Sequence, residues 1–471
     1  MKNRTLKRMS AILLLVVMTC LFCSCGEQKV VIEPMEEKEV HAISFDIIGG
    51  KDVMPIAGYY GPTAQRYSVD GQSRPDYYTD EIFSRVAECG INMFTYSSTD
   101  YVTYPQQVKK MLELGEKYNL GITVTDTKIS GATVDSSISL EDLAARLAEY
   151  CDYPAFCGVY VIDEPGSQYF RASENQVKDT PIFAPVFKNL NELGVWGYGN
   201  LNPVWRPSDY QKYEQMVAEY CELCKPTYLS WDHYVWDEGR TVETYFYNMD
   251  LIRKYAEKYD IPFWSFVQAG SQWNDAKETF DTNGYYPSEG QMRWSANTSL
   301  AYGAKGLQYF PVLQPSHFAY AETNRMDFQR NGILGAWGNK TQWWYYAQNI
   351  NKQVAAIDEV LMNSVNEGVI VTGEQASLDT KDLQFVMDAT SWRELESVEG
   401  NTMIGCFNYH GKSALYVVNY EAEYAQKVTL NLQDAYNLSI TQSGENSKVK
   451  TNTLTLDMQP GDGVLVVFEK E

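Results

Sequence analysis

Two adjacent carboxylates, Asp163 and Glu164, stand where a short β-branched and aromatic run ends at a Pro-Gly turn. The run Val159–Ile162 has the composition of a buried parallel strand, so both acids are expected at its carboxyl end, where α/β enzymes place their chemistry. A carboxylic acid partly screened from water can act there as a general acid or base. The same two acids could instead cap a following helix, because Asp, Pro and Gly are common at strand ends.

Acids, amides and aromatic rings also end other strand-like segments. They are Tyr59, Tyr60, Tyr96, Ser97, Asp126, Lys128, Asn200, Asn202, Ser230–Tyr234, Phe266–Gln268, Tyr309 and Phe310. If the strands are parallel in one barrel, these side chains meet at one rim, where rings can stack on sugar faces and polar groups can bind hydroxyls. The side chains expected to bind substrate are Asp163, Asn200, Tyr60, Tyr96, Trp231, His233, Tyr234, Gln268 and Tyr309.

The elements that must position these residues are strands alternating with amphipathic helices, a pattern typical of parallel βα units. The eight predicted strands are Pro55–Tyr60, Ile91–Tyr96, Gly121–Asp126, Val159–Glu164, Val195–Leu201, Thr227–Tyr234, Pro262–Gln268 and Gly306–Val312. Eight units in about 260 residues predict a closed (β/α)8 TIM barrel. An open doubly wound sheet is the competing fold, and it would need a glycine-rich phosphate loop or a clear switch point, neither of which we find.

The predicted helices support this division into βα units. Asp80–Cys89 places its apolar residues on one face, and Ser139 and Ser288 each open a predicted helix as N-caps. Beyond the eighth strand, Trp337–Asn366 predicts a helix or a helical pair.

The C-terminal part changes character. Short alternating strands follow to residue 471 and predict an all-β sandwich domain. The expected boundaries are 41–366 for the barrel and 367–471 for the sandwich. His41–Ile48 is also strand-like, and it could cover the barrel floor or join the sandwich.

Composition narrows the class of partner. The formal net charge of -22 over 471 residues disfavours nucleic acid or anionic membrane and favours a neutral or cationic ligand. Aromatic residues make up 14% of the chain, which suits sugar binding. The four His are widely separated, so we expect no metal site, and no cofactor is implied. Cys221 and Cys224 have the spacing of a redox motif but lie in a predicted helix, where we interpret them as buried thiols.

The N-terminus predicts export. A basic start precedes the short apolar run Ala11–Phe22, and Phe22–Gly26 then resembles a bacterial lipobox, with Cys25 as the lipidated residue and Phe22 where Leu is usual. Residues 1–25 are therefore expected to be a lipoprotein signal peptide and 26–40 a flexible tether. This places the protein on the extracellular face of the bacterial cell membrane, attached through the lipid alone.

Within Pro55–Val312 the chain resembles the clan A glycoside hydrolases, and more loosely the β-galactosidase-like enzymes of glycoside hydrolase family 42. The resemblance is carried by Asp163–Pro165 closing the fourth strand, Trp231–Tyr234 closing the sixth, and Arg293–Gly306 leading into the eighth. It implies that Glu164 is the general acid/base. In that clan the nucleophile is a Glu ending the seventh strand, and this sequence has Gln268 there.

Three arrangements could replace the missing nucleophile. Asp232, at the end of the sixth strand, is the first choice, although it could equally bind a substrate hydroxyl or pair with an Arg. Glu278 or Glu289 could fold back over the cleft, although Glu289 also fits a helix N-terminus. Asp163 could instead orient an attacking substrate N-acetyl group.

The sequence thus predicts an extracellular, surface-anchored glycoside hydrolase that acts on an oligo- or polysaccharide, with Glu164 and Asp232 as catalytic residues. The alternative is a non-catalytic carbohydrate-binding lipoprotein, either a pseudoenzyme or a transporter's solute-binding protein. Gln268 favours the pseudoenzyme, whereas a solute-binding protein should have two hinged, doubly wound lobes.

Overall fold

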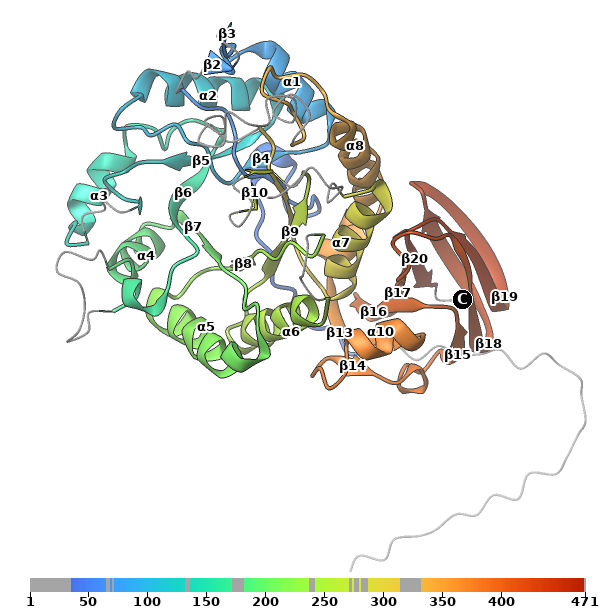
Figure 1. Ribbon diagram of the computed structural model, residues 1–471. Coiled ribbons are helices and arrows are strands. Elements are labelled where there is room, and N and C mark those ends of the chain that lie inside the picture. The colour runs from blue at the N-terminus through green and yellow to red at the C-terminus, as the bar shows by residue number, and fades with distance from the viewer. Residues whose placement is uncertain are drawn as a thin grey trace, which may run out of the picture.

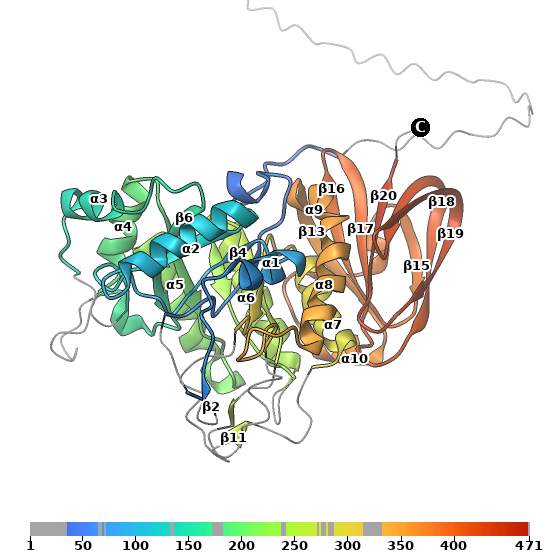
Figure 2. The same ribbon diagram turned by 90° about the horizontal axis from the view of Figure 1, so that it is seen from above.

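The computed structural model describes residues 35–64, 68–69, 72–131, 136–171, 182–236, 242–270, 273–274, 279–280, 287–313 and 332–469. Figure 1 shows a barrel ringed by helices, with an all-β domain at one side. The view in Figure 2 places α7 (Glu289–Ala301) and α8 (Gln342–Ala355) on the side of the barrel that faces this domain. In the part of the chain described, no helix combines the length and apolarity needed to cross a membrane.

Eight parallel strands close into a barrel in the order β1-β12-β9-β8-β7-β6-β5-β4. Their bounds are β1 Ile56–Gly58, β4 Met93–Phe94, β5 Gly121–Thr125, β6 Phe156–Asp163, β7 Trp196–Leu201, β8 Leu229–Trp231, β9 Phe263–Gln268 and β12 Leu307–Phe310. Each lies within or overlaps a predicted strand, so the (β/α)8 fold is confirmed. Two short hairpins lie outside the barrel sheet, β2 (Ser68–Val69) with β3 (Gln72–Ser73) and β10 (Trp273–Asn274) with β11 (Thr279–Phe280).

Amphipathic helices pack around the strands. The remaining ones are α1 Asp80–Glu88, α2 Pro105–Tyr118, α3 Leu140–Leu147, α4 Ala184–Glu192, α5 Tyr210–Cys224 and α6 Val242–Lys258. The predicted N-caps are present: the Ser139 side chain accepts from the Asp142 N–H, and Ser288 forms a full capping box with Gln291. The Cys221 and Cys224 thiols are buried and unbridged on α5, and burial raises the pKa of Cys221 to about 12.

A hydrophobic cluster made mainly of aromatic side chains fills the barrel interior. The buried members of this cluster are Ala57, Tyr59, Met93, Trp196, Tyr198, Tyr228, Tyr234, Trp264 and Phe266. Phe45 closes the floor, with its ring centroid 5.1 Å from that of Trp196 and 6.5 Å from that of Trp264. The expectation of a strand over His41–Ile48 was therefore wrong. The segment is extended and ends in a 3-10 turn, η1 (Asp46–Ile48), because a closed barrel offers it no free strand edge.

The C-terminal domain is one curled sheet in the order β14-β13-β16-β17-β20-β18-β15, with β19 paired to β18. Its elements are β13 Ser364–Thr372, α10 Glu374–Asp379, β14 Val386–Met387, β15 Leu395–Glu399, β16 Thr402–Tyr409, β17 Lys412–Asn419, β18 Gln426–Gln442, β19 Glu445–Met458 and β20 Gly463–Phe468. The first part of β18 pairs with β15 and the last part with β20, so this strand turns the sheet around its own core. Instead of the two facing sheets of a sandwich, a single sheet encloses this core.

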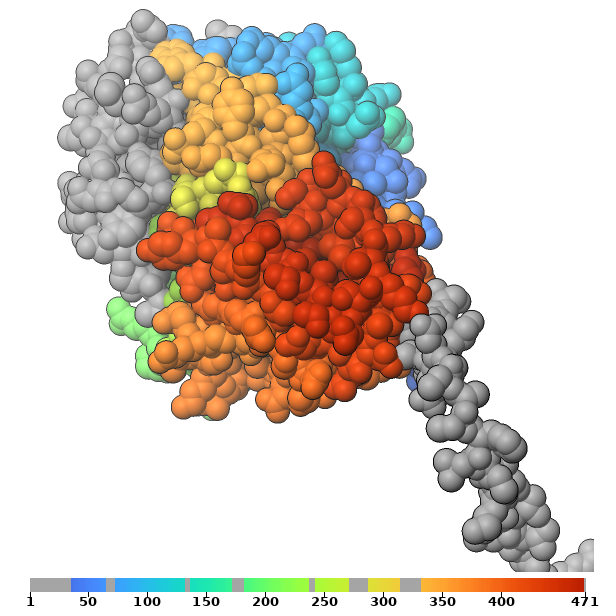
Figure 3. All heavy atoms as spheres, turned by 90° about the vertical axis from the view of Figure 1, so that its right-hand side faces the viewer, coloured from blue at the N-terminus to red at the C-terminus, as the bar shows by residue number. Residues whose placement is uncertain are grey.

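The β domain lies against the helices of the barrel, and Figure 3 views the molecule from that side. Asn297 of α7 donates to the Gly461 carbonyl at 2.8 Å and accepts from the Tyr416 hydroxyl at 2.7 Å. The helical pair expected before this domain is present as α8 and α9 (Asp358–Met362).

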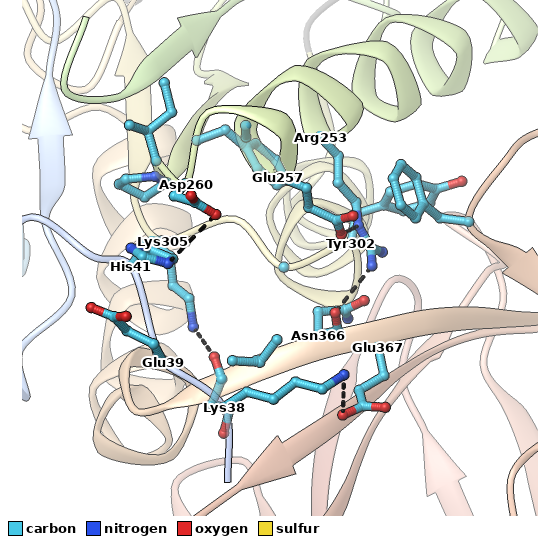
Figure 4. Close-up of a pocket in the computed structure, with 18 residues that line it drawn as sticks. Lys38, Glu39, His41, Arg253, Glu257, Asp260, Tyr302, Lys305, Asn366 and Glu367 are labelled. Atoms are coloured by element: carbon cyan, nitrogen blue, oxygen red, sulfur yellow. Dashed lines mark hydrogen bonds and ion pairs between the residues drawn. The ribbon is translucent and has the colours of Figure 1, made fainter. Parts of the chain in front are cut away.

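A pocket of about 370 Å³ marks the junction between the barrel floor, the N-terminal segment and β13 (Figure 4). The buried Lys305 ammonium donates to the carbonyl oxygens of Leu361 and Ser364, the latter at 2.5 Å. The buried Arg253 guanidinium donates to the Asn366 carbonyl at 3.1 Å. These two cations hold α9 and β13 to the barrel, and we interpret the pocket as part of this junction.

Candidate active site

Three carboxyl groups share the carboxyl-terminal rim of the barrel. Asp163 is the last residue of β6, Glu164 follows it, and Asp232 follows β8. The intervening strand β7 places Asn200 in register with Asp163 on one side and Ser230 on the other. Parallel strands in a closed barrel end at the same face, so the predicted convergence of these residues with Gln268 is confirmed.

A β-bulge sets the direction of Asp163. The register of β6 against β7 shifts between Tyr160 and Ile162. Val161 and Ile162 consequently both pack in the outer layer between strands and helices, whereas Tyr160 belongs to the interior aromatic cluster. The extra residue brings Asp163 to the same side as Tyr160, although strict alternation would separate them.

A chain of hydrogen bonds fixes the amide beside Asp163. The Tyr198 hydroxyl donates to Gln308 Oε1 at 2.9 Å, and Gln308 Nε2 donates to Ser230 Oγ at 2.7 Å. Ser230 Oγ donates to Asn200 Oδ1 at 2.8 Å, so Asn200 Nδ2 is left to donate to Asp163 Oδ1 at 3.2 Å. This polarity aims an N–H group at the carboxylate and favours its ionised form.

Asp163 experiences two opposing influences on its pKa. Its side chain is exposed at the rim, yet desolvation by the side chains around it raises the pKa of its carboxyl. Hydrogen bonds from Tyr59 and Asn200 lower the pKa in turn.

Asp232 is the most strongly perturbed of the three. Its side chain is only 6% exposed, and among the described residues its Oδ1 has no hydrogen-bond partner. Burial, followed by the charges of Glu164 and Asp163, raises the pKa of Asp232 well above its usual range. Bonds from Tyr234 and Asn200 oppose this only in part. Burial and two neighbouring acids therefore both favour the protonated form of Asp232.

Glu164 is exposed and has an unusual backbone. Its φ of 47° lies in the left-handed region, and its N–H donates to the Asn200 carbonyl at 2.8 Å. Tyr60, at another point of the rim, has a φ of 59°. Non-glycine residues adopt this conformation rarely and at a cost, and such residues concentrate at functional sites.

Aromatic rings surround the carboxyls. The Tyr96 ring centroid lies 4.8 Å from that of Tyr59 and 4.5 Å from that of Tyr160. Phe310 lies 5.6 Å from Tyr60 and 5.2 Å from Tyr234. Burial raises the pKa values of Tyr60, Tyr96 and Tyr234, so their hydroxyls stay protonated and can donate hydrogen bonds.

Trp231 and Tyr309, which were expected to bind substrate, lie on the outer face of the barrel strands, away from the carboxyls. Trp231 is fully buried against α6, with its ring centroid 5.4 Å from that of Tyr245, and the Tyr309 hydroxyl donates to Asn351 of α8 at 2.8 Å. Both lie on the outer face of their strands because successive strand residues alternate. These assignments are corrected. Phe310 takes the place expected for Tyr309, and Asp232 is the residue after β8 that reaches the site.

Gln268 and His233 lie at the rim with mainly structural contacts. Gln268 is 3% exposed, and its Nε2 donates to the carbonyls of Trp236 and Gly270, both at 3.1 Å. His233 Nε2 lies 3.0 Å from Thr244 Oγ1, and its ring centroid is 4.6 Å from that of Trp205. Both residues hold the loops that follow β8 and β9.

Other candidate acids are accounted for elsewhere. Glu289 Oε1 accepts from Arg293 at 2.7 Å and from Asn349 at 2.6 Å, so it joins α7 to α8, consistent with its interpretation as a helix N-terminal acid. Asp126 is fully buried and accepts two bonds from Arg146, while Lys128 is exposed. Glu278 and Cys25 lie outside the described residues. Within the described ranges, no three His, Cys, Asp or Glu side chains are grouped to hold a metal ion.

Two aromatic residues near the carboxyls were missed. Tyr160 lies in the interior cluster beside Asp163, and only the bulge in β6 places the two together. Tyr213 belongs to α5, yet the charges of Asp232 and Glu164, after burial, raise its pKa. Tyr160 could have been predicted, because it lies in the strand that ends at Asp163. Nothing in the sequence marks Tyr213, a helix residue, as a neighbour of the carboxyls.

No protein-family model matches the sequence, and no curated protein matches it. Among solved structures, a family 39 glycoside hydrolase from Bacteroides cellulosilyticus is similar at 10% identity and a TM-score of 0.49, covering 89% of this chain and 82% of its own. A family 27 β-L-arabinopyranosidase from Geobacillus stearothermophilus is similar at 10% identity and 0.46, covering 89% and 96%. A maltogenic α-amylase from Thermotoga neapolitana gives 12% and 0.46, covering 89% and 99%. Membership of family 42 stays a prediction.

Proposed function

We propose that this protein is a glycoside hydrolase in which Glu164 and Asp232 are the two catalytic carboxyls. The observation that carries the proposal is the contrast between them: Asp232 is buried with a raised pKa, and Glu164 is exposed at the same rim. A buried carboxyl suits the role of acid and a solvated carboxyl the role of anion, so the difference in exposure assigns one role to each. The ring of Tyr and Phe side chains supplies surfaces for a sugar.

In this mechanism Asp232 is protonated and acts as the acid, and Glu164 is the ionised carboxylate. Asp232 protonates the glycosidic oxygen as the bond to the anomeric carbon breaks, and the Glu164 carboxylate faces the positive charge that develops on the sugar. Water then adds to the anomeric carbon, and the proton it releases restores the acid. Asp163, held by Asn200, adds negative charge and hydrogen-bonding capacity beside the sugar.

This assignment differs from the one implied by the resemblance, which gave the proton to Glu164. Burial of Asp232 supports this reversed assignment, because burial raises the pKa of a carboxyl and favours its protonated form. Gln268 cannot serve as a nucleophile through its amide, so the mechanism uses no carboxylate at the end of β9.

The test is a hydrolysis screen with matched variants. Wild-type protein is incubated with aryl glycosides and oligosaccharides of the common neutral sugars, and released sugar is measured. We expect Glu164→Gln and Asp232→Asn to lose activity by about two to four orders of magnitude on oligosaccharides. Glu289→Gln, a change in an acid whose carboxyl is bound to Arg293 and Asn349, should keep wild-type activity. Full activity in either catalytic-pair variant would contradict the proposal.

Gln268 favours one second candidate, a barrel that binds carbohydrate without cleaving it. Its amide occupies the position where the clan has its nucleophile. A wild-type protein that binds glycans in the screen but releases no sugar from any of them would support this candidate.

We also propose that the protein is lipid-anchored at the outer face of the cell membrane through Cys25. The lipobox-like segment supports this. The proposed substrate, an oligo- or polysaccharide, would be met outside the cell.

A further inference from the structure

A second hollow adjoins the carboxyls at the rim. It has a volume of about 680 Å³ and lies between the turn after β6, which includes Gly166, and the segment from β7 to α5, which includes Asn202 and Trp205. Gly166 stands two residues after Glu164 and Asn202 directly follows β7, so the hollow lies at the same end of the barrel as the proposed catalytic pair.

Trp205 lines this hollow with a partly exposed aromatic ring. Its side chain is 42% exposed, although its ring packs against His233 with centroids 4.6 Å apart. A large indole that is fixed by a neighbour and still open to solvent is a feature of binding surfaces. The C–H face of a sugar ring is a matching partner, because it can cover the indole while its hydroxyls remain hydrated.

Tyr213 also lines this hollow and carries a hydroxyl group. It is 6% exposed, and among the described residues its hydroxyl has no hydrogen-bond partner. It lines the hollow, and the charges of Asp232 and Glu164 act on it, so it lies near both the hollow and the catalytic pair. A buried hydroxyl without a partner costs free energy unless a ligand or water completes its bond.

We propose that this hollow binds a second sugar ring of the substrate, stacked on Trp205 and hydrogen-bonded to the Tyr213 hydroxyl. The inference rests on the proposed function and deepens it: the substrate class is an oligo- or polysaccharide that occupies two adjoining subsites. A glycoside with a small aglycone would fill only the subsite at Asp163, Glu164 and Asp232.

The kinetic test compares two substrates with the same cleaved sugar, an oligosaccharide and an aryl monoglycoside. For Trp205→Ala, kcat/KM on the oligosaccharide should fall at least about tenfold, mainly through KM, and should change less than about threefold on the monoglycoside. Trp205→Phe keeps a ring and should recover most of the loss. Tyr424→Ala, a change in a 71% exposed aromatic of the β domain, is the control. Equal losses on both substrates, or none on the oligosaccharide, would overturn the subsite.

A binding measurement separates failure of the subsite from failure of the hydrolase. Isothermal titration uses gluco-, galacto-, manno- and xylo-oligosaccharides of two to six rings with wild type, Trp205→Ala and Tyr424→Ala. If wild type cleaves nothing but Trp205→Ala weakens binding at least tenfold, the subsite stands and the hydrolase proposal fails. If cleavage depends on Glu164 and Asp232 but not on Trp205, the hydrolase stands and the subsite fails. Binding of no oligosaccharide overturns the subsite.

Discussion

At the scale of single residues, two carboxyls on one rim differ in burial. Asp232 is buried beside two other acids, Glu164 and Asp163, so loss of its proton would place a negative charge in poorly hydrated surroundings. Glu164 is open to solvent on a left-handed turn. The two groups therefore respond differently to substitution and to pH.

The leaving group of the substrate should reveal which carboxyl donates the proton. Asp232→Asn should slow glycosides with poor leaving groups by about 10²- to 10⁴-fold and activated aryl glycosides far less, whereas Glu164→Gln should slow both. Wild-type kcat/KM should fall as pH rises through the raised pKa of Asp232, because the acid form is lost, and Asp232→Asn should lack this alkaline limb. The opposite pattern of leaving-group sensitivity would assign the proton to Glu164.

The sequence was sufficient to identify the rim residues but not their directions. Asp163, Asn200, Asp232 and Tyr234 were all found from their places after strand-like runs. Trp231 and Tyr309 were misassigned, because the observed strands begin and end within the predicted runs, and a shift of one residue reverses the face.

At the scale of elements, the βα pattern predicted every barrel strand because the strands are short apolar runs that alternate with amphipathic helices. The bulge in β6 was not predictable, since nothing in Val159–Asp163 marks an extra residue. Nor could the N-terminal segment be assigned: Ile43 and Phe45 suit a strand or a plug equally well, and only closure of the barrel decides between them.

Lys305 should make the junction between barrel and β domain sensitive to pH. Burial lowers its pKa to about 7, whereas the unfolded chain keeps the usual value near 10.4. Between these pH values the unfolded state binds more protons, so the free energy of unfolding of wild type should rise with pH relative to Lys305→Met. The rise is at most about 1.4 kcal/mol per pH unit, and below pH 7 the difference should be flat.

Urea unfolding of both proteins at pH 6, 7.5 and 9 measures this difference. Comparison with Lys305→Met removes the contributions of other titrating groups, which the two proteins share. A difference that is constant over the three pH values would show that the ammonium stays charged between the carbonyls of Leu361 and Ser364.

At the scale of the whole molecule, the barrel and the β domain form one body, joined by α7, Lys305 and Arg253. The change from period-3.6 to period-2 patterning revealed the two parts in the sequence. Their contact was hidden, because the residues that make it are far apart in the chain and ordinary in type.

The proposed lipid anchor gives a prediction at this scale. Cys25→Ala should release the protein to the medium or leave an unprocessed precursor at the membrane, because the acyl attachment is lost. Cell fractionation followed by mass spectrometry of the N-terminal peptide distinguishes these outcomes. Recovery of wild-type protein as a fully soluble form that begins beyond Cys25 would refute the anchor.

The course of the N-terminal segment determines which end of the barrel a membrane tether would reach. Met35 bonds to Gly411 of the β domain at 3.0 Å, and the chain then passes to Phe45 on the barrel floor. In Figure 2 this segment and the hairpins β2–β3 and β10–β11 lie at opposite ends of the barrel. A tether that leads into the floor would turn the carboxyl rim outward, toward polymers too large to reach the bilayer, and products would leave into the surroundings and not toward the cell.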